Sequence, residues 1–307
     1  MNADFKLEEV LNKQQLGFLL MSISAIGLAV GTIMMKILPA EAGLTPGQVA
    51  VWRFLIAAPL TWLVTLIQKK GKGLLPETPW WLLAMGLVYS VASVLALLAL
   101  SRLPSSIYVI ILFFYPSLIV VFHLLNRKPV PGLWWLGLPL TLIGLVLTVS
   151  HFGQPLALDL LGIILSILNG ITIAVYMLMS ERVFQKNTDR QLSSSWVMTG
   201  AMVVGLLLAF VFGFKAPETL RGWVYLAVLG VVGTLIPILS MNFGIQLIGS
   251  ARGSVISTLQ PVGAVLISTL FLHEALTPLQ WLGGILVIAA IILLQRSPDA
   301  LAQRQGQ

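Results

Sequence analysis

Polar and charged side chains interrupt several long apolar stretches of this sequence, and they are the groups through which the chain could bind a molecule. The candidate binding residues are Arg53, Tyr89, Ser93, Tyr108, Tyr115, Asn169, Tyr176, Asn242 and Gln260. A guanidinium group binds carboxylate or phosphate, and amides and hydroxyls donate and accept hydrogen bonds. Tyrosine rings also offer an apolar face to an organic side chain. Such a set is typical of a binding site for a small organic molecule.

Helical spacing gathers several of these side chains on common faces, since residues three, four or seven apart lie on one side of a helix. The groups are Ser166, Asn169, Thr172 and Tyr176; Tyr89 and Ser93; Tyr108 and Tyr115; and Thr234 and Asn242. Ser and Thr in membrane helices commonly bond to their own helix or to a neighbour. Asn and Tyr are costlier to leave unpaired, so they are the stronger candidates for lining a cavity.

Arg53 is the charge expected to lie deepest in an apolar stretch, about one helical turn from its outer end. An arginine at the membrane centre costs roughly 2.5 to 3.5 kcal/mol on insertion scales, and snorkelling toward the interface lowers that cost. Two interpretations follow. Arg53 either contacts a carboxylate or phosphate of a substrate, or it is a snorkelling or helix-linking arginine.

Tyr115 and Gln260 each precede a proline, Pro116 and Pro261 respectively. Proline removes one helix hydrogen bond and frees a backbone carbonyl group. We therefore predict helix kinks at both prolines, which are candidate gating points where a substrate would meet the preceding side chains. The alternative is that each kink serves packing alone.

The elements that position these residues are predicted to be membrane helices. Of the 307 residues, 58% are hydrophobic and only 9% are charged, and the mean hydropathy is +0.96. Because a soluble domain carries roughly 25% charged residues, this composition excludes a water-soluble globule. The absence of cysteine excludes disulfides, thiolate metal sites and cysteine nucleophiles. We expect no cofactor and no metal.

Uninterrupted apolar stretches of about 20 residues, long enough to cross a bilayer, predict ten transmembrane helices in an all-α integral membrane protein. They cover about 16–38, 48–67, 80–100, 105–125, 132–150, 159–180, 194–214, 222–248, 254–272 and 278–294. The two ends, 1–15 and 295–307, are polar. The first stretch lacks a small-residue cleavage signal, so we interpret it as a retained helix and not as a signal peptide.

Lysine and arginine in the connections predict the orientation, because short basic loops stay cytoplasmic. Thirteen of the eighteen basic residues fall on the side that holds both chain ends, and three fall on the other side. Both ends, 1–15 and 295–307, are therefore expected in the cytoplasm. The basic residues are scattered singly rather than clustered on one face, so no nucleic acid partner is expected.

Two segments repeat at a spacing of 145 residues, namely 99–116 (ALSRLPSSIYVIILFFYP) and 244–261 (GIQLIGSARGSVISTLQP). Each has a span-breaking turn, a restart rich in small residues, and a proline at its end. Further on, the tripeptide WLG at 135–137 matches WLG at 281–283 after a slip of one residue. This common register predicts an internal duplication.

Each predicted repeat, 16–150 and 151–294, holds five spans. An odd number inserts the second repeat upside down relative to the first, which is the arrangement of many secondary transporters whose substrate site lies near the midplane between the repeats. Two pseudo-symmetric halves can exchange conformations, and the repeat therefore predicts alternating access.

Five segments also carry a resemblance to a known family. They are AIGLAVGTIMMKIL (25–38), WRFLIAAPLTWLV (52–64), YPS (115–117), QPV (260–262) and LTPLQWLGGILVIAAIILL (276–294). Together they resemble the EamA-type family of the drug/metabolite transporter superfamily across nearly the whole chain. The family motifs that carry over are Arg53, Phe54, Pro116 and Pro261. Gln260 departs from the glutamate that is frequent in relatives, which argues against coupling through a carboxylate there.

The resemblance implies ten helices, cytoplasmic termini, a five-plus-five inverted repeat, and export or exchange of small metabolites such as amino acids. Other branches of the superfamily carry nucleotide-sugars, sugar phosphates or cationic drugs. We expect a protein of the bacterial inner membrane, present as a monomer or homodimer, whose partners are the small-molecule substrate and the lipid bilayer.

All eleven acidic residues map to loops, termini or span ends. Proton or sodium coupling usually relies on an intramembrane acid, and a cationic substrate would need one as a counter-charge. We therefore expect a neutral, zwitterionic or anionic substrate and a facilitated or weakly coupled mechanism. Phosphate recognition favours clustered Arg and Lys, so an amino acid or a similar small metabolite is preferred to a nucleotide-sugar, a sugar phosphate or a drug.

Other classes of protein fit the sequence less well. A zinc metalloprotease needs HExxH, and His273-Glu274 has no second histidine four residues after the first; SxxK, GxSxG and paired membrane aspartates are also missing from the sequence. No enzymatic activity is expected. A channel requires rings of carbonyls or charges around a symmetric pore, which a two-fold duplication does not readily build. A membrane scaffold or assembly factor is the alternative from a different class.

Overall fold

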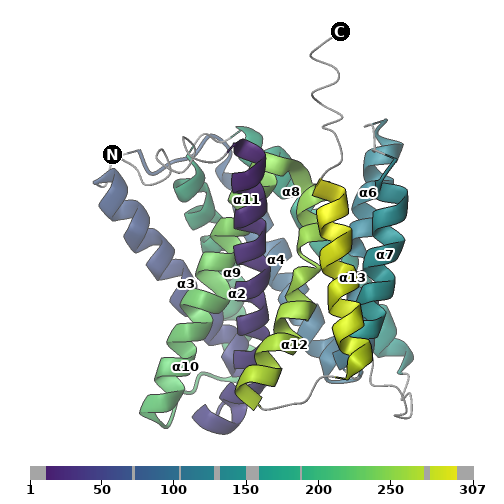
Figure 1. Cartoon of the computed structure of the whole chain (residues 1–307). Helices are drawn as coiled ribbons and strands as arrows, with labels where there is room; N and C mark the ends of the chain where they lie inside the picture. Colours follow the sequence, from purple (N-terminus) through teal and green to yellow (C-terminus); the bar gives the residue numbers. More distant parts are fainter. Residues whose placement is uncertain are drawn as a thin grey trace.

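The computed structural model of the chain describes residues 12–70, 73–103, 105–127, 132–149, 159–186, 189–272 and 277–295. Regular secondary structure within these ranges is helical, so the predicted all-α fold is confirmed (Figure 1). The predicted polar ends fall largely outside the described residues, as do His273 and Glu274.

The helices follow one another as α2 (Lys13–Ala42), α3 (Pro46–Lys69), α4 (Pro79–Leu100), α5 (Ser105–Leu112), α6 (Tyr115–Leu125), α7 (Trp134–Val149), α8 (Leu160–Lys186), α9 (Arg190–Phe212), α10 (Leu220–Gly230), η1 (Val231–Leu235), α11 (Ile236–Ile256), α12 (Leu259–Leu272) and α13 (Pro278–Gln295). The element η1 is a short π-helix.

Capping signals fix the ends of the first two helices. Asn12 and Thr45 precede α2 and α3, and each side chain accepts a hydrogen bond from the backbone N–H three residues on. Gln15 and Gln48 return the bond to the capping residue, which completes a capping box at each start. Gly43 ends α2 in the left-handed conformation, with φ of 62°.

Within the described residues, seven helical segments are long and apolar enough to cross a membrane, and Trp134–Thr148 and Pro278–Leu293 are shorter apolar helices. Together with α12 they correspond to the ten predicted transmembrane helices. Large apolar side chains such as Trp80 and Phe210, which are 80% and 88% exposed, lie on the outside of the bundle. Such a surface suits a lipid environment, because hydrocarbon solvates apolar side chains.

Three of the ten spans are interrupted. The fourth consists of α5 and α6, and the eighth consists of α10, η1 and most of α11. Gly249, with φ of 80° and ψ of 163°, kinks α11. The last residues of α11 therefore belong to the ninth span, which continues through α12.

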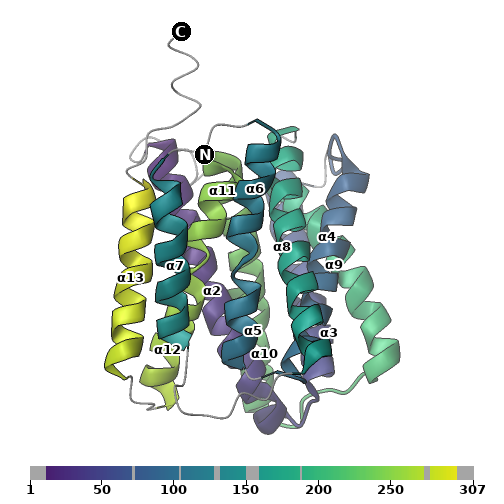
Figure 2. The same ribbon diagram turned by 90° about the vertical axis from the view of Figure 1, so that its right-hand side faces the viewer.

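The packing of the helices reflects the internal repeat. Helix α4 packs along α8, and α11 packs along α2. Helices α2 and α8 are the first spans of their halves, and α4 and α11 belong to the third spans. The two contacts are therefore equivalent under the repeat. The last helices of the two halves, α7 and α13, run side by side (Figures 1 and 2), and the start of α2 lies at the same end of the bundle as the end of α13. A five-plus-five repeat accounts for this arrangement.

Small residues allow the helices to approach closely. A Cβ at Gly31 of α2 would lie 2.8 Å from the carbonyl oxygen of Gly233, and one at Gly144 of α7 would lie 2.9 Å from the carbonyl oxygen of Gly283 in α13. A Cβ at Gly86 of α4 would meet the backbone of α9. Glycine is therefore needed where these helices cross.

Candidate functional site

Arg53 lies on α3, partly buried, and its guanidinium group joins three helical elements. Its Nε donates a hydrogen bond of 2.9 Å to Thr234 Oγ1 in η1, and its Nη2 donates one of 2.6 Å to the Tyr89 hydroxyl on α4. The guanidinium carbon also lies 5.6 Å from the centre of the Tyr89 ring, within the range of a cation–π contact. Arg53 thus makes the helix-linking contacts that the sequence allowed.

The charge of Arg53 is not matched by an acidic side chain in the described part of the chain. Both hydrogen bonds go to neutral hydroxyl groups, and none of the ion pairs between described residues includes it. A guanidinium has five N–H donors in a planar fork, so donors remain for an anionic group of a ligand.

Thr234, which holds Arg53, lies in the π-helical turn η1. Its hydroxyl donates to the carbonyl oxygen of Leu229, five residues earlier, at 2.8 Å. Pro237 explains why the helix opens here, because it has no N–H for the carbonyl of Gly233. Turns of this kind inside α-helices occur frequently at functional sites. The glycine and proline nearby are the only sequence signal for it.

Tyr89 connects Arg53 to the second half of the chain. Its ring centre lies 5.4 Å from that of Tyr176 on α8. The Tyr176 hydroxyl donates a hydrogen bond of 2.8 Å to Asn242 Oδ1 on α11, and Ser180 donates a second one of 3.1 Å to the same oxygen. We call Arg53, Tyr89, Tyr176, Asn242, Ser180 and Thr234 the Arg53 network. It contains four of the predicted binding residues.

Two buried asparagines have amide groups that are only half used. Asn169 on α8 donates to the Tyr108 hydroxyl at 2.7 Å, while its Oδ1 is buried without a partner among the described residues. The Nδ2 atom of Asn242 is likewise buried without a partner among the described residues. A buried polar atom without a hydrogen bond costs free energy, so both atoms are positions where a bound molecule or water would be stabilised.

Tyr115 and Gln260 lie at corresponding breaks in the fourth and ninth spans. Helix α5 ends at Leu112, four residues before Pro116, and α11 ends at Ile256, five residues before Pro261, so a helix break precedes each proline. The Tyr115 hydroxyl donates to the Ser254 carbonyl at 3.5 Å. Gln260 is partly exposed, and its side chain has no hydrogen bond with the described residues.

Some predicted groupings change in the structure. Tyr108 and Tyr115 do not share one helix face, because the break places them on α5 and α6. The Ser93 hydroxyl donates to the Tyr89 carbonyl of its own helix at 3.2 Å. The hydroxyl of Thr172 likewise bonds within α8. Own-helix bonding, which was one of the two alternatives, therefore accounts for Ser93 and Thr172.

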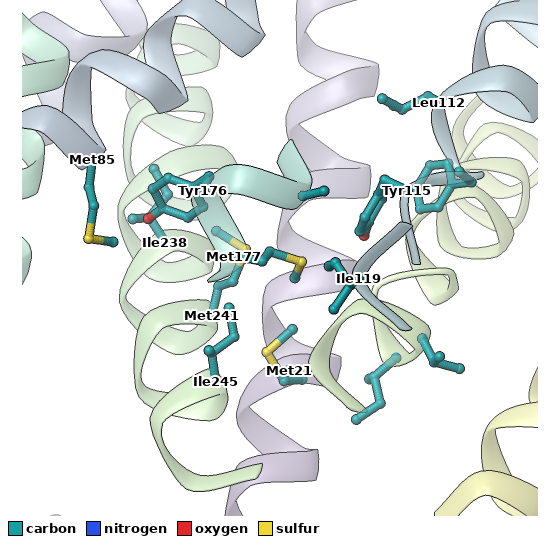
Figure 3. Packing of buried hydrophobic residues seen from close by; sticks show 14 of the residues in the cluster. Met21, Met85, Leu112, Tyr115, Ile119, Tyr176, Met177, Ile238, Met241 and Ile245 are labelled. Atoms are coloured by element: carbon teal, nitrogen blue, oxygen red, sulfur yellow. The ribbon is translucent and has the colours of Figure 1, made fainter. Parts of the chain in front are cut away.

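The space between these polar groups is filled by methionines. In the view of Figure 3, Met177 lies between the rings of Tyr176 and Tyr115, with Met21 and Met241 beside it. Methionine is unbranched and flexible, so it fills irregular space and tolerates repacking. The centre of the bundle is therefore apolar and adaptable, with polar groups at its edges.

One acidic residue lies elsewhere than expected. The sequence places Glu181 just after the end of a span, but α8 continues to Lys186 and Glu181 is only 8% exposed. It contacts Ser250 and His123. Glu181 therefore lies inside a helix, near its end, and is buried, whereas the sequence places it just outside a span; Val183 and Phe184 are buried beside it.

Comparison with known proteins agrees with the geometry. The profile of the EamA-like transporter family matches residues 15–150 and again residues 160–296. An uncharacterized transporter of Synechocystis sp. is 28% identical over 70% of this chain, and the chain spans just under two thirds of its length, 66%. The uncharacterized inner membrane transporter YicL of Salmonella typhimurium is 29% identical over 68% of this chain and 71% of its own length.

Two further matches extend the comparison. The uncharacterized transporter YcbK of Bacillus subtilis is 26% identical over 79% of this chain and 81% of its own. A solved crystal structure superposes with a TM-score of 0.74 over 94% of this chain and 98% of that one, at 16% identity, which shows a shared fold. The two family matches cover nearly the whole chain, one in each half. The chain therefore belongs to the EamA-like transporter family and is a multi-pass membrane protein.

Proposed function

We propose that the chain is an alternating-access transporter which exports or exchanges small organic metabolites, most of all amino acids. The observation that carries the proposal is the Arg53 guanidinium. It is held in place by Thr234 and Tyr89 and has no acidic partner among the described side chains. A fixed guanidinium with donors to spare fits a carboxylate, which it binds in a planar, bidentate manner.

Asn169 and Asn242 offer further buried polar atoms to a ligand. The unpartnered Oδ1 of Asn169 is an acceptor suited to an ammonium group, which has only donors. The methionines and tyrosine rings around Met177 offer a deformable apolar surface for a side chain. A phosphate would favour several cations together, and Arg53 is the only cation in the Arg53 network.

Alternating access is supported by the way in which the network crosses the molecule. Arg53 and Tyr89 belong to the first five spans, and Tyr176, Asn242 and Thr234 belong to the second five. Rocking of one half against the other, as in transporters built from inverted repeats, would change these contacts. The π-turn η1 and the breaks before Pro116 and Pro261 are places where the helices can bend.

The membrane and the orientation are part of the proposal. One relative is named an inner membrane transporter, and we place this chain in the same kind of membrane. Thirteen of its eighteen basic residues lie on the side of the chain ends, so both ends face the cytoplasm.

A thermal-shift screen tests the substrate class. Purified protein would be heated with amino acids, nucleosides, sugar phosphates and cationic dyes in separate samples, since a ligand that binds the folded state raises the apparent melting temperature. At 100 times its Kd a ligand adds about 2.7 kcal/mol of stability. We expect amino acids to raise the melting temperature. A shift with sugar phosphates and none with any amino acid would overturn the proposal.

A further inference from the structure

Glu181 and its neighbours form a buried polar cluster away from the Arg53 network. The Oε2 atom of Glu181 accepts a hydrogen bond of 3.1 Å from the backbone N–H of Ser250 and a second, short one from the Ser250 hydroxyl. His123 Nε2 lies 3.4 Å from that oxygen and 3.2 Å from Ser250 Oγ. We call these three residues the Glu181 cluster.

The Glu181 cluster joins three helices at one point. His123 lies in the last turn of α6, and Glu181 lies on α8. Ser250 lies on α11, directly after the kink at Gly249. The side chains of His123 and Glu181 are only 12% and 10% exposed, and Ser250 is fully buried. The Glu181 cluster therefore holds the turn between the eighth and ninth spans against α6 and α8.

The other charged side chains that these helices carry close to the cluster are basic. On α8 itself the next residue, Arg182, has its guanidinium carbon 5.4 Å from the centre of the Phe122 ring of α6. On α11 the charged residue is Arg252, two positions after Ser250. The other helices packed against α8 are α4 and α5, and their only titratable side chains are Tyr89 and Tyr108, whose hydroxyls are bonded to Arg53 and Asn169.

The geometry of the cluster depends on the charge of Glu181. An ionised carboxylate only accepts hydrogen bonds, so one oxygen can take donors from Ser250 and His123 together. A protonated carboxyl group carries a donor of its own, and its remaining bonds lose the charge assistance that makes such bonds about twice as strong as neutral ones. A proton on Glu181 therefore weakens the hydrogen bonds through which its Oε2 atom joins the three helices.

We propose that Glu181 is a proton-binding site, and that the uptake of a proton from the water at this end of the bundle releases Ser250 and His123 and lets α6, α8 and the kink at Gly249 separate. The proton adds to the Glu181 carboxylate, and no other covalent bond is made or broken. The site goes beyond the proposed transport of amino acids, because it supplies an ion whose binding is linked to the opening of one end of the transporter. Buried acids in membrane helices mark such proton sites in pumps and transporters.

Spin-label distances test this proposal without any substrate, so that the result does not depend on the proposed function. The chain has no cysteine, so Leu125→Cys on α6 and Lys186→Cys on α8, both at exposed positions, would carry the only two labels. We expect a longer distance to gain population as the pH falls from about 8 to about 4, the ordinary pKa of a glutamic acid side chain. Equal distributions at both ends of this range would overturn the proposal.

Variants of the labelled protein test whether Glu181 is the residue that binds the proton. Glu181→Gln is neutral at every pH, so it should show the longer distance throughout and lose the pH dependence. The matched control is Glu77→Gln, an exposed carboxylate before α4, which should behave as the wild type does. A pH dependence that persists in Glu181→Gln, including one that disappears instead in His123→Gln, would contradict the assignment to Glu181.

Two further measurements keep the test decisive if Glu181→Gln does not fold. Ser250→Ala removes the hydroxyl that donates to Glu181, so the longer distance should be more populated than in the wild type at the same pH; unchanged populations would count against the cluster. In wild-type protein, infrared difference spectra between the two pH values should contain a protonated carboxyl band from an apolar environment. Spectra without that band would mean that Glu181 takes up no proton.

Discussion

Arg53 on α3 and Thr234 in η1 are 181 residues apart in the sequence, yet a hydrogen bond of 2.9 Å joins Nε of the one to Oγ1 of the other. The bond connects the two halves of the internal repeat. Because Thr234 occupies a π-helical turn, the geometry of that turn sets the position of the only guanidinium in the Arg53 network.

Replacing Thr234 by valine preserves the shape of the side chain and removes the acceptor for Arg53. A hydrogen bond to a charged group contributes about 1.5 to 3 kcal/mol, so Thr234→Val should lower the melting temperature of the purified protein. The control is Thr172→Val, whose hydroxyl bonds only to its own helix. Both melting temperatures would be measured by thermal unfolding in detergent. Equal decreases in the two variants would show that the hydrogen bond from Arg53 to Thr234 does not stabilise the protein.

The hydrogen bond from Tyr176 to Asn242 should appear as a coupling in a double-mutant cycle. Tyr176→Phe and Asn242→Ala each remove one partner of a buried bond of 2.8 Å. Residues in one network show interaction free energies of about 0.5 to 3 kcal/mol, so the double variant should lose less stability than the two single losses added together. Tyr108→Phe combined with Asn242→Ala is the control pair, since Tyr108 bonds to Asn169, and its effects should be additive.

Gly86 is required where α4 crosses α9. A Cβ there would meet the backbone of Val197, Gly200 and Ala201, and overpacking of this kind typically costs 1 to 3 kcal/mol, about the loss expected for Gly86→Ala. Gly132→Ala is the matched control, because a Cβ at Gly132 has nothing within 4 Å. Thermal unfolding of both variants checks the prediction, and a Gly86→Ala protein as stable as the control would refute the close crossing.

Asp159 makes the start of α8 sensitive to acid. The backbone N–H of Gly162, with a smaller effect from Arg102, holds the pKa of Asp159 below its ordinary value. The stabilisation is therefore present above the pKa of the unfolded chain and is lost as the pH falls through the lower pKa of the folded state. Below about pH 4, amides at the start of α8 should exchange faster than in Asp159→Asn, which keeps the oxygen for Gly162 but does not titrate. Hydrogen exchange at matched pH would show the difference, and equal acid sensitivity would exclude Asp159 as its cause.

Much of the fold was predictable because apolar length determines membrane helices. The stretch 48–67 predicts a helix that the structure extends only slightly, to Pro46–Lys69, since Thr45 and Gln48 form the capping box. The sequence also predicts kinks at Pro116 and Pro261, because a proline lacks the N–H that a continuous helix needs, and the structure has a helix break shortly before each of them.

The unpredicted features depend on contacts between distant residues. The π-turn at Thr234 is a local response to Pro237 and to the packing of Gly233 against Gly31, which no hydropathy pattern contains. The burial of Glu181 depends on the length of α8 beyond its apolar stretch, and on Ser250, 69 residues away. Likewise, spacing placed Tyr108 with Tyr115, whereas tertiary packing pairs Tyr108 with Asn169.

The central claim is that Arg53 binds the carboxylate of a transported amino acid. Proteoliposomes containing wild-type protein would be loaded with a mixture of amino acids, and the uptake of the same amino acids in radiolabelled form would be measured alongside Arg53→Gln, Arg53→Lys and Arg102→Gln. Arg102 pairs with Asp159 at the surface, at 3.2 Å, and serves as the matched control for the loss of one arginine.

We predict exchange of amino acids by the wild type and by Arg102→Gln. In Arg53→Gln we predict that the apparent affinity falls about 10- to 100-fold, as expected when a charged hydrogen bond of about 1.5 to 3 kcal/mol is lost. Arg53→Lys should retain only part of the wild-type affinity, because lysine lacks the planar, forked guanidinium group. Absence of amino acid exchange by the wild type, or amino acid exchange unchanged in Arg53→Gln, would contradict the claim.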